Sequence, residues 1–361
     1  MISSSLLSLV RCPDCRSPLD GGTRAPGHPA PAAPCVLVCE GCGRTYESPP
    51  DYLDLRPREQ FTEQTKYLDE ALHVDARHER VSPPLLGSKI RNDMLREFLA
   101  PRAGELVADL GCGSGRTLLW NRDLGATTIG IDIAPFFSRE ARSGIDLMLA
   151  DLRKLPFADN TFDKAWSLDV LEHLSPDALH GMLAEANRVL KPGGALFVYT
   201  HVRKNAPIAA GLRWINRLAK QLESWDLIDL RQERLRKSDH LNPLRDIPHL
   251  ETVAADTGFR VARIRYYTPL VGGFIENIMM RMAERAMARR AAGRLAATGT
   301  GDAAEADAAA VREARTTAKE RIANSRTTYG ALRALSMAMK LDLLLFGRVV
   351  SGPFFALLVK K

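Results

Sequence analysis

Three glycines and two carboxylates within one short stretch could hold a small charged cofactor. The run Leu106-Val-Ala-Asp-Leu-Gly-Cys-Gly-Ser-Gly115 is apolar up to Asp109 and then becomes a glycine turn. The turn contains Gly111, Gly113 and Gly115. Glycines allow a tight turn and let a ligand approach the backbone where a Cβ would otherwise intrude. Asp132 ends the next apolar run, at about the 20-residue spacing from which a carboxylate reaches ribose hydroxyls.

The carboxylate just before the turn indicates which cofactor fits. A Gly-x-Gly-x-Gly pattern by itself also occurs in NAD-binding proteins and in structural turns. Asp109 would repel a pyrophosphate but would attract the amino group of a methionine moiety. We therefore expect a cofactor with an amino-acid part. Cys112, inside the turn, is expected to be a small packed residue and not a nucleophile.

Four cysteines near the N-terminus have the spacing of a metal site. Cys12-Pro-Asp-Cys15 and Cys39-Glu-Gly-Cys42 are two Cys-x2-Cys pairs. Four thiolates complete a tetrahedron around Zn²⁺ and leave no open position, which is typical of structural zinc. A metal commonly replaces the missing core in a segment this small. Cys35 is expected to be a bystander, although it could compete for the metal.

Alternating strand and helix patterns must position the glycine turn. Strands are predicted at 106–110, 128–131, 146–149, 162–168, 195–200, 259–267 and 354–359. A helix is predicted over 176–190, ending at Lys191-Pro-Gly-Gly194. This alternation predicts an α/β fold with a doubly wound parallel sheet.

Composition divides the chain into three parts. Residues 1–58 are predicted to be a zinc ribbon, 59–103 a helical linker or cap, and 104–361 a cofactor-binding domain. Helical insertions in that domain are expected at 203–246 and 272–346. The second insertion includes an Ala-rich stretch at 303–310.

Four further motifs follow the turn in order along the chain. They are Asp151-Leu152, Leu155–Asp163, Leu171-Glu-His-Leu174 and Arg188–Gly194. With the turn, they make residues 104–202 resemble class I S-adenosylmethionine-dependent methyltransferases of the type 11 group. That group includes ubiquinone, menaquinone and sterol methyltransferases. The resemblance implies a Rossmann-like seven-stranded sheet whose last strand is antiparallel, and residues 354–359 fit that place.

The same resemblance implies S-adenosyl-L-methionine as the cofactor and assigns its contacts. Asp109 and the turn from Gly111 to Gly115 would hold the methionine part, and Asp132 the ribose. The residues that would flank the adenine are Ile133, Asp151 and Leu152.

The cysteine-rich segment has a resemblance of its own. Residues 9–56 resemble the small zinc-ribbon activator proteins of methyltransferases. A zinc ribbon also precedes the methyltransferase domain in bacterial 23S rRNA guanine-N1 methyltransferases. The Pro-rich loop between the two cysteine pairs matches neither group closely, which leaves the role of the ribbon open.

Polar residues after the fourth and fifth strands could act on the acceptor. His173 is the predicted general base because its pKa lies near neutrality when unperturbed. Asp169, Glu172, Tyr199 and His201 lie in the same region. Alternatively, Glu172 and His173 only shape the cofactor pocket. The fourth strand is not followed by Asn-Pro-Pro-aromatic or Pro-Cys, which disfavours methylation of adenine N6 and of cytosine C5.

A basic amphipathic pattern begins at Ile275. Ile275, Ile278, Met279 and Met282 share one face, and Arg281, Arg285 and Arg289 recur four residues apart on another. Such a helix could lie on an anionic membrane surface, follow a phosphate backbone, or be an ordinary solvated face over a packed one.

These observations favour transfer of a methyl group to a small-molecule or lipid-like acceptor. RNA methylation is the alternative, supported by the zinc ribbon and the net charge of +7. A protein acceptor and a binding protein without activity are less favoured. No secretory signal is recognised, and no apolar run reaches the roughly 18 residues that span a bilayer. We expect a cytoplasmic protein with peripheral membrane contact as one option, and the oligomeric state is left open.

Overall fold

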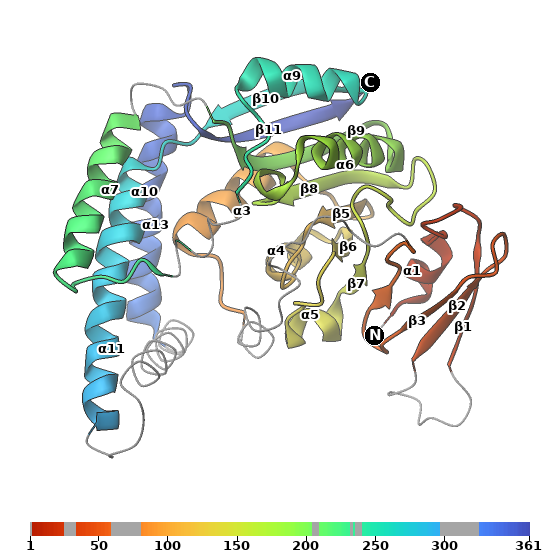
Figure 1. The fold of residues 1–361 in the computed structure, drawn as a ribbon, viewed down its shortest axis with the longest axis horizontal. Coiled ribbons are helices and arrows are strands. Elements are labelled where there is room, and N and C mark those ends of the chain that lie inside the picture. The colour runs from red at the N-terminus through yellow and green to blue at the C-terminus, as the bar shows by residue number, and fades with distance from the viewer. Residues whose placement is uncertain are drawn as a thin grey trace.

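An eight-stranded sheet separates a small cysteine-rich unit from a layer of long helices (Figure 1). The computed structural model describes residues 2–24, 34–58, 81–203, 209–231, 234, 240–296 and 325–361. Several regions discussed above lie outside the described residues. They are 25–33 in the Pro-rich loop, 59–80 in the expected linker, and 204–208, 232–233, 235–239 and 297–324 in the expected insertions, the last including the Ala-rich stretch at 303–310.

The sheet confirms the predicted architecture and adds one strand. Its order is β10-β11-β9-β8-β5-β6-β7-β4, and β11 is antiparallel to both of its neighbours while the other pairs are parallel. The strands are β4 (Leu53–Asp54), β5 (Leu106–Leu110), β6 (Thr127–Asp132), β7 (Asp146–Leu149), β8 (Phe162–Leu168), β9 (Leu190–His201), β10 (Phe259–Tyr266) and β11 (Pro353–Lys360). All seven predicted strands are present. The additional strand, β4, comes from the N-terminal segment and pairs with β7.

Burial on both faces explains why the central strands are nearly uniformly apolar. In β5, Val107, Ala108 and Leu110 are each fully buried. Parallel strands covered by helices on both sides have this pattern. The rings of Phe197 and Phe355, on neighbouring strands, stack with centroids 6.0 Å apart and fill one side of the sheet.

Short helices cover the sheet and fix its turns. They are α3 (Leu86–Leu99), α4 (Arg116–Asn121), α5 (Arg139–Gly144), α6 (Pro176–Val189) and α9 (Ile247–Asp256), with 3₁₀ turns η3 (Arg122–Leu124) and η4 (Leu171–His173). The predicted helix at 176–190 is α6. Ser175 caps it, its hydroxyl accepting from the Ala178 amide, and Pro176 sits in its first turn.

The helical insertions form a separate layer beside the sheet (Figure 1). The layer consists of α7 (Ala209–Ser224), α10 (Leu270–Phe274), the π-helical turn η5 (Ile275–Met280), α11 (Arg281–Ala296) and α13 (Arg326–Phe346). The buried Asp342 carboxylate ties α13 to α10 by accepting from the amides of Val271 and Gly272, at 2.9 and 2.8 Å. The helical expectation for 203–246 is too broad, because residues 225–230 and 240–246 lie outside helices.

No helix within the described ranges is long and apolar enough to cross a membrane.

The N-terminal unit shares its core with the sheet. It contains α1 (Ser4–Leu9) and an antiparallel sheet of β1 (Leu19–Arg24), β2 (Cys35–Cys39) and β3 (Thr45–Ser48). The Arg11 amide donates to the Pro156 carbonyl at 2.9 Å, and the Ser3 hydroxyl donates to the Asp146 carboxylate at 2.6 Å. Leu6 and Val10 are buried in the same hydrophobic cluster as the sheet residue Ile131. Loss of order in this unit would therefore expose part of the main core.

Candidate functional site

The glycine turn after β5 has a backbone that only glycine adopts without strain. Gly111 has a φ of 87°, and a Cβ there would lie 2.3 Å from a methyl group of Val170. Its amide donates to the Ile131 carbonyl at 2.8 Å, which ties the turn to β6. Gly115, with a φ of 78°, begins α4. The glycines therefore set the path of the chain between β5 and α4.

Asp132, at the end of β6, reaches back to this turn. Its carboxylate accepts hydrogen bonds from the amides of Gly113, at 2.7 Å, and Ala134, at 3.1 Å. Burial raises the pKa of Asp132, while these backbone hydrogen bonds act in the opposite direction. The carboxylate is thus held by the backbone at the edge of the turn.

Asp109 lies deeper, with only 2% of its surface exposed. Burial raises the pKa of its carboxyl group to about 8, Trp166 beside it lowers it, and the charge of Asp132 raises it further. A buried carboxylate favours a cationic partner, because a nearby positive charge offsets the cost of removing it from water.

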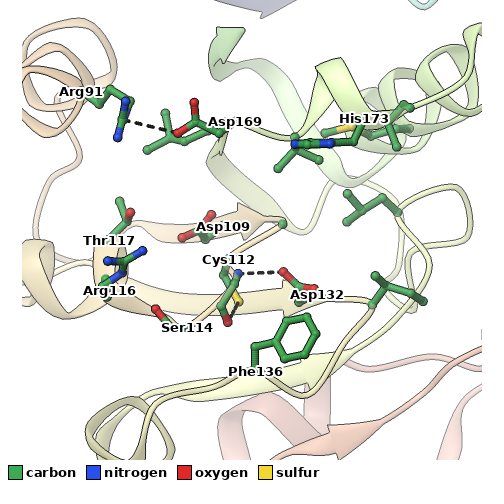
Figure 2. Close-up of a pocket in the computed structure, with 18 of the residues that line it drawn as sticks. Arg91, Asp109, Cys112, Ser114, Arg116, Thr117, Asp132, Phe136, Asp169 and His173 are labelled. Atoms are coloured by element: carbon green, nitrogen blue, oxygen red, sulfur yellow. Dashed lines mark hydrogen bonds and ion pairs between the residues drawn. The ribbon is translucent and has the colours of Figure 1, made fainter. Parts of the chain in front are cut away.

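These residues line one cavity of about 690 Å³ (Figure 2). Most of the predicted cofactor-site residues line this cavity together with His173, although they lie far apart in the sequence. They are Asp109, Gly111, Gly113, Asp132, Ile133, Asp151, Leu152 and His173. Gly115 instead forms the start of α4, and Cys112 is buried against Gly130 of β6, as expected for a packed residue. The volume is in the range of small-molecule sites.

One end of the cavity combines apolar side chains with a fixed carboxylate. Asp151 is buried, accepts from the Arg153 amide at 2.8 Å and pairs with the Arg153 guanidinium at 3.0 Å. Ile133 and Leu152 line the same region, and Phe136 adds an aromatic ring that the sequence analysis did not single out. Apolar walls with a few fixed polar groups are suited to a flat heterocycle.

Across the cavity from the glycine turn lies an ion pair that the sequence did not indicate (Figure 2). Arg91 of α3 approaches Asp169 at 3.4 Å, and its guanidinium lies 5.5 Å from the ring centre of Tyr199. Burial would lower the pKa of Arg91, but the Asp169 charge raises it above its usual value. Asp169 has a φ of 57°, in the left-handed region where Asp is tolerated better than most residues. Arg91 was missed because it belongs to a helix with no motif.

Beside this ion pair, η4 and β9 bring a glutamate and histidines together. Glu172 is 1% exposed and accepts from the Thr200 hydroxyl at 2.9 Å, and its other oxygen lies 3.5 Å from Nδ1 of His201. Burial alone would raise the pKa of Glu172, but His201 beside it lowers it. The rings of His173 and His240 meet edge to face, with centroids 4.7 Å apart. His173, Glu172 and His201 were predicted from the sequence, whereas His240 was not.

The four predicted metal ligands of the N-terminal unit converge. The sulfur atoms of Cys12, Cys15, Cys39 and Cys42 all lie within 4.8 Å of one another. Cys35 lies outside this cluster, in β2, as expected of a bystander. This arrangement is compatible with the tetrahedral site of a structural zinc.

Side chains around the cysteines support the cluster. The Tyr46 hydroxyl lies 3.2 Å from the Cys12 sulfur, and Asp14 forms an ion pair with Arg44. Groups of this kind orient the ligands of a metal site. The donor set and its surroundings therefore fit Zn²⁺.

Comparisons with known proteins agree with the central part of this site. Residues 108–198 match the family model described as a methyltransferase domain. The sterol 4-C-methyltransferase of Caenorhabditis elegans is 38% identical over 106 residues, which are 27% of this chain and 31% of that protein. The probable tRNA methyltransferase 9B of Mus musculus is 34% identical over 134 residues, 36% of this chain and 30% of that protein. The chain thus spans less than a third of the length of these two relatives.

Among solved structures, the Haemonchus contortus phosphoethanolamine N-methyltransferase 2 in complex with S-adenosyl-L-methionine covers the chain broadly. Its TM-score is 0.47 at 16% identity, over 88% of this chain and 63% of that one.

Proposed function

We propose that this chain, which carries a methyltransferase domain over residues 108–198, is an S-adenosyl-L-methionine-dependent methyltransferase with a small-molecule or lipid-like acceptor. The observation that carries the proposal is the buried Asp109 carboxyl beside a glycine turn whose open edge is bounded by Asp132. This combination fits a ligand with a cationic amino-acid part and a ribose.

Each part of the cofactor is bound by a different set of residues. Asp109 and the turn from Gly111 to Gly113 bind the methionine part, with the Asp109 carboxylate facing its ammonium group. Asp132 accepts from the ribose hydroxyls. The adenine lies between the apolar side chains of Ile133 and Leu152, near Asp151. A space is open at Gly113, where a Cβ would meet nothing within 4 Å.

The cofactor supplies a methyl group on a positively charged sulfur, and the protein mainly supplies proximity and orientation. Asp169 and Arg91 line the cavity across from the glycine turn, where a polar group of the acceptor would be oriented. His173 lines the same cavity and is the proposed general base if the acceptor must lose a proton.

Exposed apolar surface on the helical layer supports an acceptor that is at least partly apolar. The helical layer exposes large apolar side chains, and its α13 packs against α3, the helix that provides Arg91. The exposed members include Trp214, Phe274, Met279, Met282, Leu344 and Leu345. Sterol methylation by the nematode relative is consistent with this choice, whereas the name of the mouse relative points to RNA.

We assign the N-terminal unit, residues 1–58, the role of a zinc ribbon that stabilises the domain at residues 104–361. Cys12, Cys15, Cys39 and Cys42 would hold one Zn²⁺, and the shared core transmits its effect to the sheet. Because all four positions would be filled by thiolates, this zinc takes no part in the chemistry.

Cofactor binding is the direct test of this proposal. Calorimetry with S-adenosyl-L-methionine should show binding by the parent that Asp109→Ala and Asp132→Ala both weaken. Unchanged affinity in both variants would overturn the assignment of the site. A methyl-transfer screen with labelled cofactor against total lipid extract, small hydroxylated compounds and ribosomal RNA then separates acceptors. Label in RNA alone would reverse the choice of acceptor class and leave the cofactor assignment standing.

A further inference from the structure

A second group of metal-ligating side chains lies next to the cofactor cavity. Glu172, His173 and His240 each offer one ligand atom, and these atoms lie within 4.8 Å of one another. Glu172 and His173 belong to η4, whereas His240 lies more than 60 residues further along the chain and contacts the ring of His173. The cluster is unrelated to the cysteines of the N-terminal unit, and the proposed cofactor contacts do not use Glu172 or His240.

The environment of Glu172 holds its carboxylate in place for a ligand. The Thr200 hydroxyl donates to one oxygen at 2.9 Å, and the Asn242 amide donates to the Glu172 backbone carbonyl at 2.9 Å. This second bond anchors the segment that carries His240. Hydrogen bonds of this kind orient the ligands in metal sites. Glu172 is 1% exposed, unlike the solvent-exposed acidic clusters that proteins carry without any metal.

The donor set is that of an open site. Two imidazoles and one carboxylate suit Zn²⁺ and neighbouring divalent transition metals, and three protein ligands leave a coordination position for another molecule. His173 lines the cavity, and so does Leu241, which follows His240. An open position here would therefore lie at the acceptor side of the cavity. His201, whose Nδ1 is 3.5 Å from Glu172, is available as a further polar neighbour.

We propose that Glu172, His173 and His240 form a binding site for a divalent transition metal of the zinc class, which binds the acceptor through an oxygen atom beside the cofactor cavity. The metal-binding claim stands by itself, whereas the role of the metal rests on the proposed methyltransferase function. The acceptor is then a hydroxyl compound. This arrangement also accounts for the convergence of histidines from η4 and the distant 240–246 segment.

The chemistry balances without an oxidant or reductant. A bound metal ion would lower the pKa of an acceptor hydroxyl group, and the proton would leave to solvent. The oxygen forms a bond to the methyl carbon while the carbon–sulfur bond breaks, and the bonding electron pair stays on sulfur. A neutral thioether and a methyl ether result. His173 would in this case be a metal ligand and not the general base.

The test measures metal binding by the full chain, independently of turnover. Protein is dialysed against a weak chelator, shown by elemental analysis to retain its cysteine-bound zinc, and titrated with Co²⁺. We expect one further equivalent of Co²⁺ to bind. Its visible bands should lack the intense sulfur-to-cobalt absorption that exchange into the cysteine site would give. His240→Gln and Glu172→Gln should each weaken Co²⁺ binding about tenfold or more.

His180→Gln is the matched control, because His180 is exposed on α6 and outside the cluster. It should bind Co²⁺ as the parent does. If burial makes Glu172→Gln fold poorly, His240→Gln, at a half-buried position, decides the outcome. The inference is overturned if the parent takes up no Co²⁺ beyond the cysteine site, or if His240→Gln binds it as tightly as the parent. Calorimetry with S-adenosyl-L-methionine on the same samples tests the proposed function separately from the metal site, since cofactor binding and Co²⁺ binding can each be lost without the other.

Discussion

The carboxylate of Asp132 accepts a hydrogen bond from the Gly113 amide at 2.7 Å, so the end of β6 is fastened to the glycine turn after β5. One side chain thus shapes the turn and is also the proposed contact of the ribose. Replacing it should affect cofactor affinity through both effects.

Asp132→Asn should weaken S-adenosyl-L-methionine binding about tenfold, because an amide is a weaker acceptor than a carboxylate. Asp132→Ala should weaken it further, because the contact to Gly113 is lost as well. Titration calorimetry measures both. Asp163→Asn is the matched control, since Asp163 also accepts from a backbone amide, that of Leu106, but does not line the cavity. Equal losses in the Asp132 and Asp163 variants would mean that the effect is one of folding.

Cofactor binding should release a proton from Asp109. The pKa of Asp109 is raised to about 8, so at about pH 6.5 the empty site holds this carboxyl mainly protonated. An α-amino group is cationic at that pH, and its approach favours the carboxylate. The proton is therefore expelled on binding, and the affinity should rise with pH up to about 8.

Calorimetry in buffers with different ionisation enthalpies counts that proton. The parent should release close to one at about pH 6.5, and Asp109→Asn should release none and bind more weakly. Equal proton release by the two proteins would place the titrating group elsewhere.

The strands of the main sheet could be predicted because each one is marked by a pattern of neighbouring residues in the sequence. Each of the five strands from β5 to β9 contains a short apolar run, and β10 and β11 complete the seven strands that were expected. The strand β4 was not predicted, because its two residues pair with β7 only after the N-terminal unit has packed against the sheet. No local pattern carries that information.

Local sequence patterns also explain which residues of the candidate site were predicted and which were not. Asp109 and Asp132 were identified because they sit at fixed distances from a glycine turn. Arg91 and His240 were missed, because each reaches the site from a segment without a motif and their partners, Asp169 and His173, lie far along the chain. The single apolar face predicted from Ile275 onward is divided in the structure, where Ile278 is buried but Met282 is exposed. The ion pairs of Arg285 and Arg289 with Asp226 were not predicted, because Asp226 lies about 60 residues earlier in the chain.

Gly111→Ala should destabilise the protein. The φ of 87° is strained for alanine, and the new Cβ would lie 2.3 Å from Val170. We expect a loss of about 1–3 kcal/mol in the free energy of unfolding, measured by urea denaturation. Adding Val170→Ala should recover only the part due to the clash. Gly144→Ala, at a position with open space, should stay within about 0.5 kcal/mol of the parent; a similar loss there would contradict the explanation.

Loss of the zinc proposed at the four cysteines should lower the stability of the whole protein. Cys39→Ser/Cys42→Ser should reduce the zinc content from about one per chain to near zero. Because the unit's core is continuous with that of the sheet, the Tm should fall by about 5 °C or more. Cys35→Ser should keep its zinc. A double variant with full zinc content would show that the ligands are wrong, and an unchanged Tm would show that the two cores are independent.

The three arginines of the expected basic face are engaged in ion pairs. Arg285 and Arg289 both contact the Asp226 carboxylate, at 2.7 and 2.9 Å, and Arg281 pairs with Glu284 at 2.7 Å. Ile275 and Ile278 are buried, whereas Met279 and Met282 are 42% and 40% exposed. The apolar stripe is thus divided between packing inside the helical layer and contact with solvent. Two roles of the arginines, holding the 225–230 segment and meeting an anionic surface, remain separable by experiment.

Changing Arg281, Arg285 and Arg289 together to Gln should leave cofactor binding intact, because none of them lines the cavity. It should reduce association with anionic lipid vesicles more than association with ribosomal RNA, since exposed Met279 and Met282 can be buried by lipid but not by RNA.

Asp226→Asn is the informative counterpart: it releases Arg285 and Arg289 from their partner and should strengthen vesicle binding in flotation assays. The Asp226 carboxylate is 60% exposed, and an ion pair at such a position contributes at most about 1 kcal/mol, so Asp226→Asn should not unfold the protein. Binding of the parent to RNA alone, with a steep salt dependence that disappears in the triple variant, would instead support a phosphate-backbone role. If both variants bind vesicles and RNA as the parent does, the arginines serve only to hold α11 against the 225–230 segment.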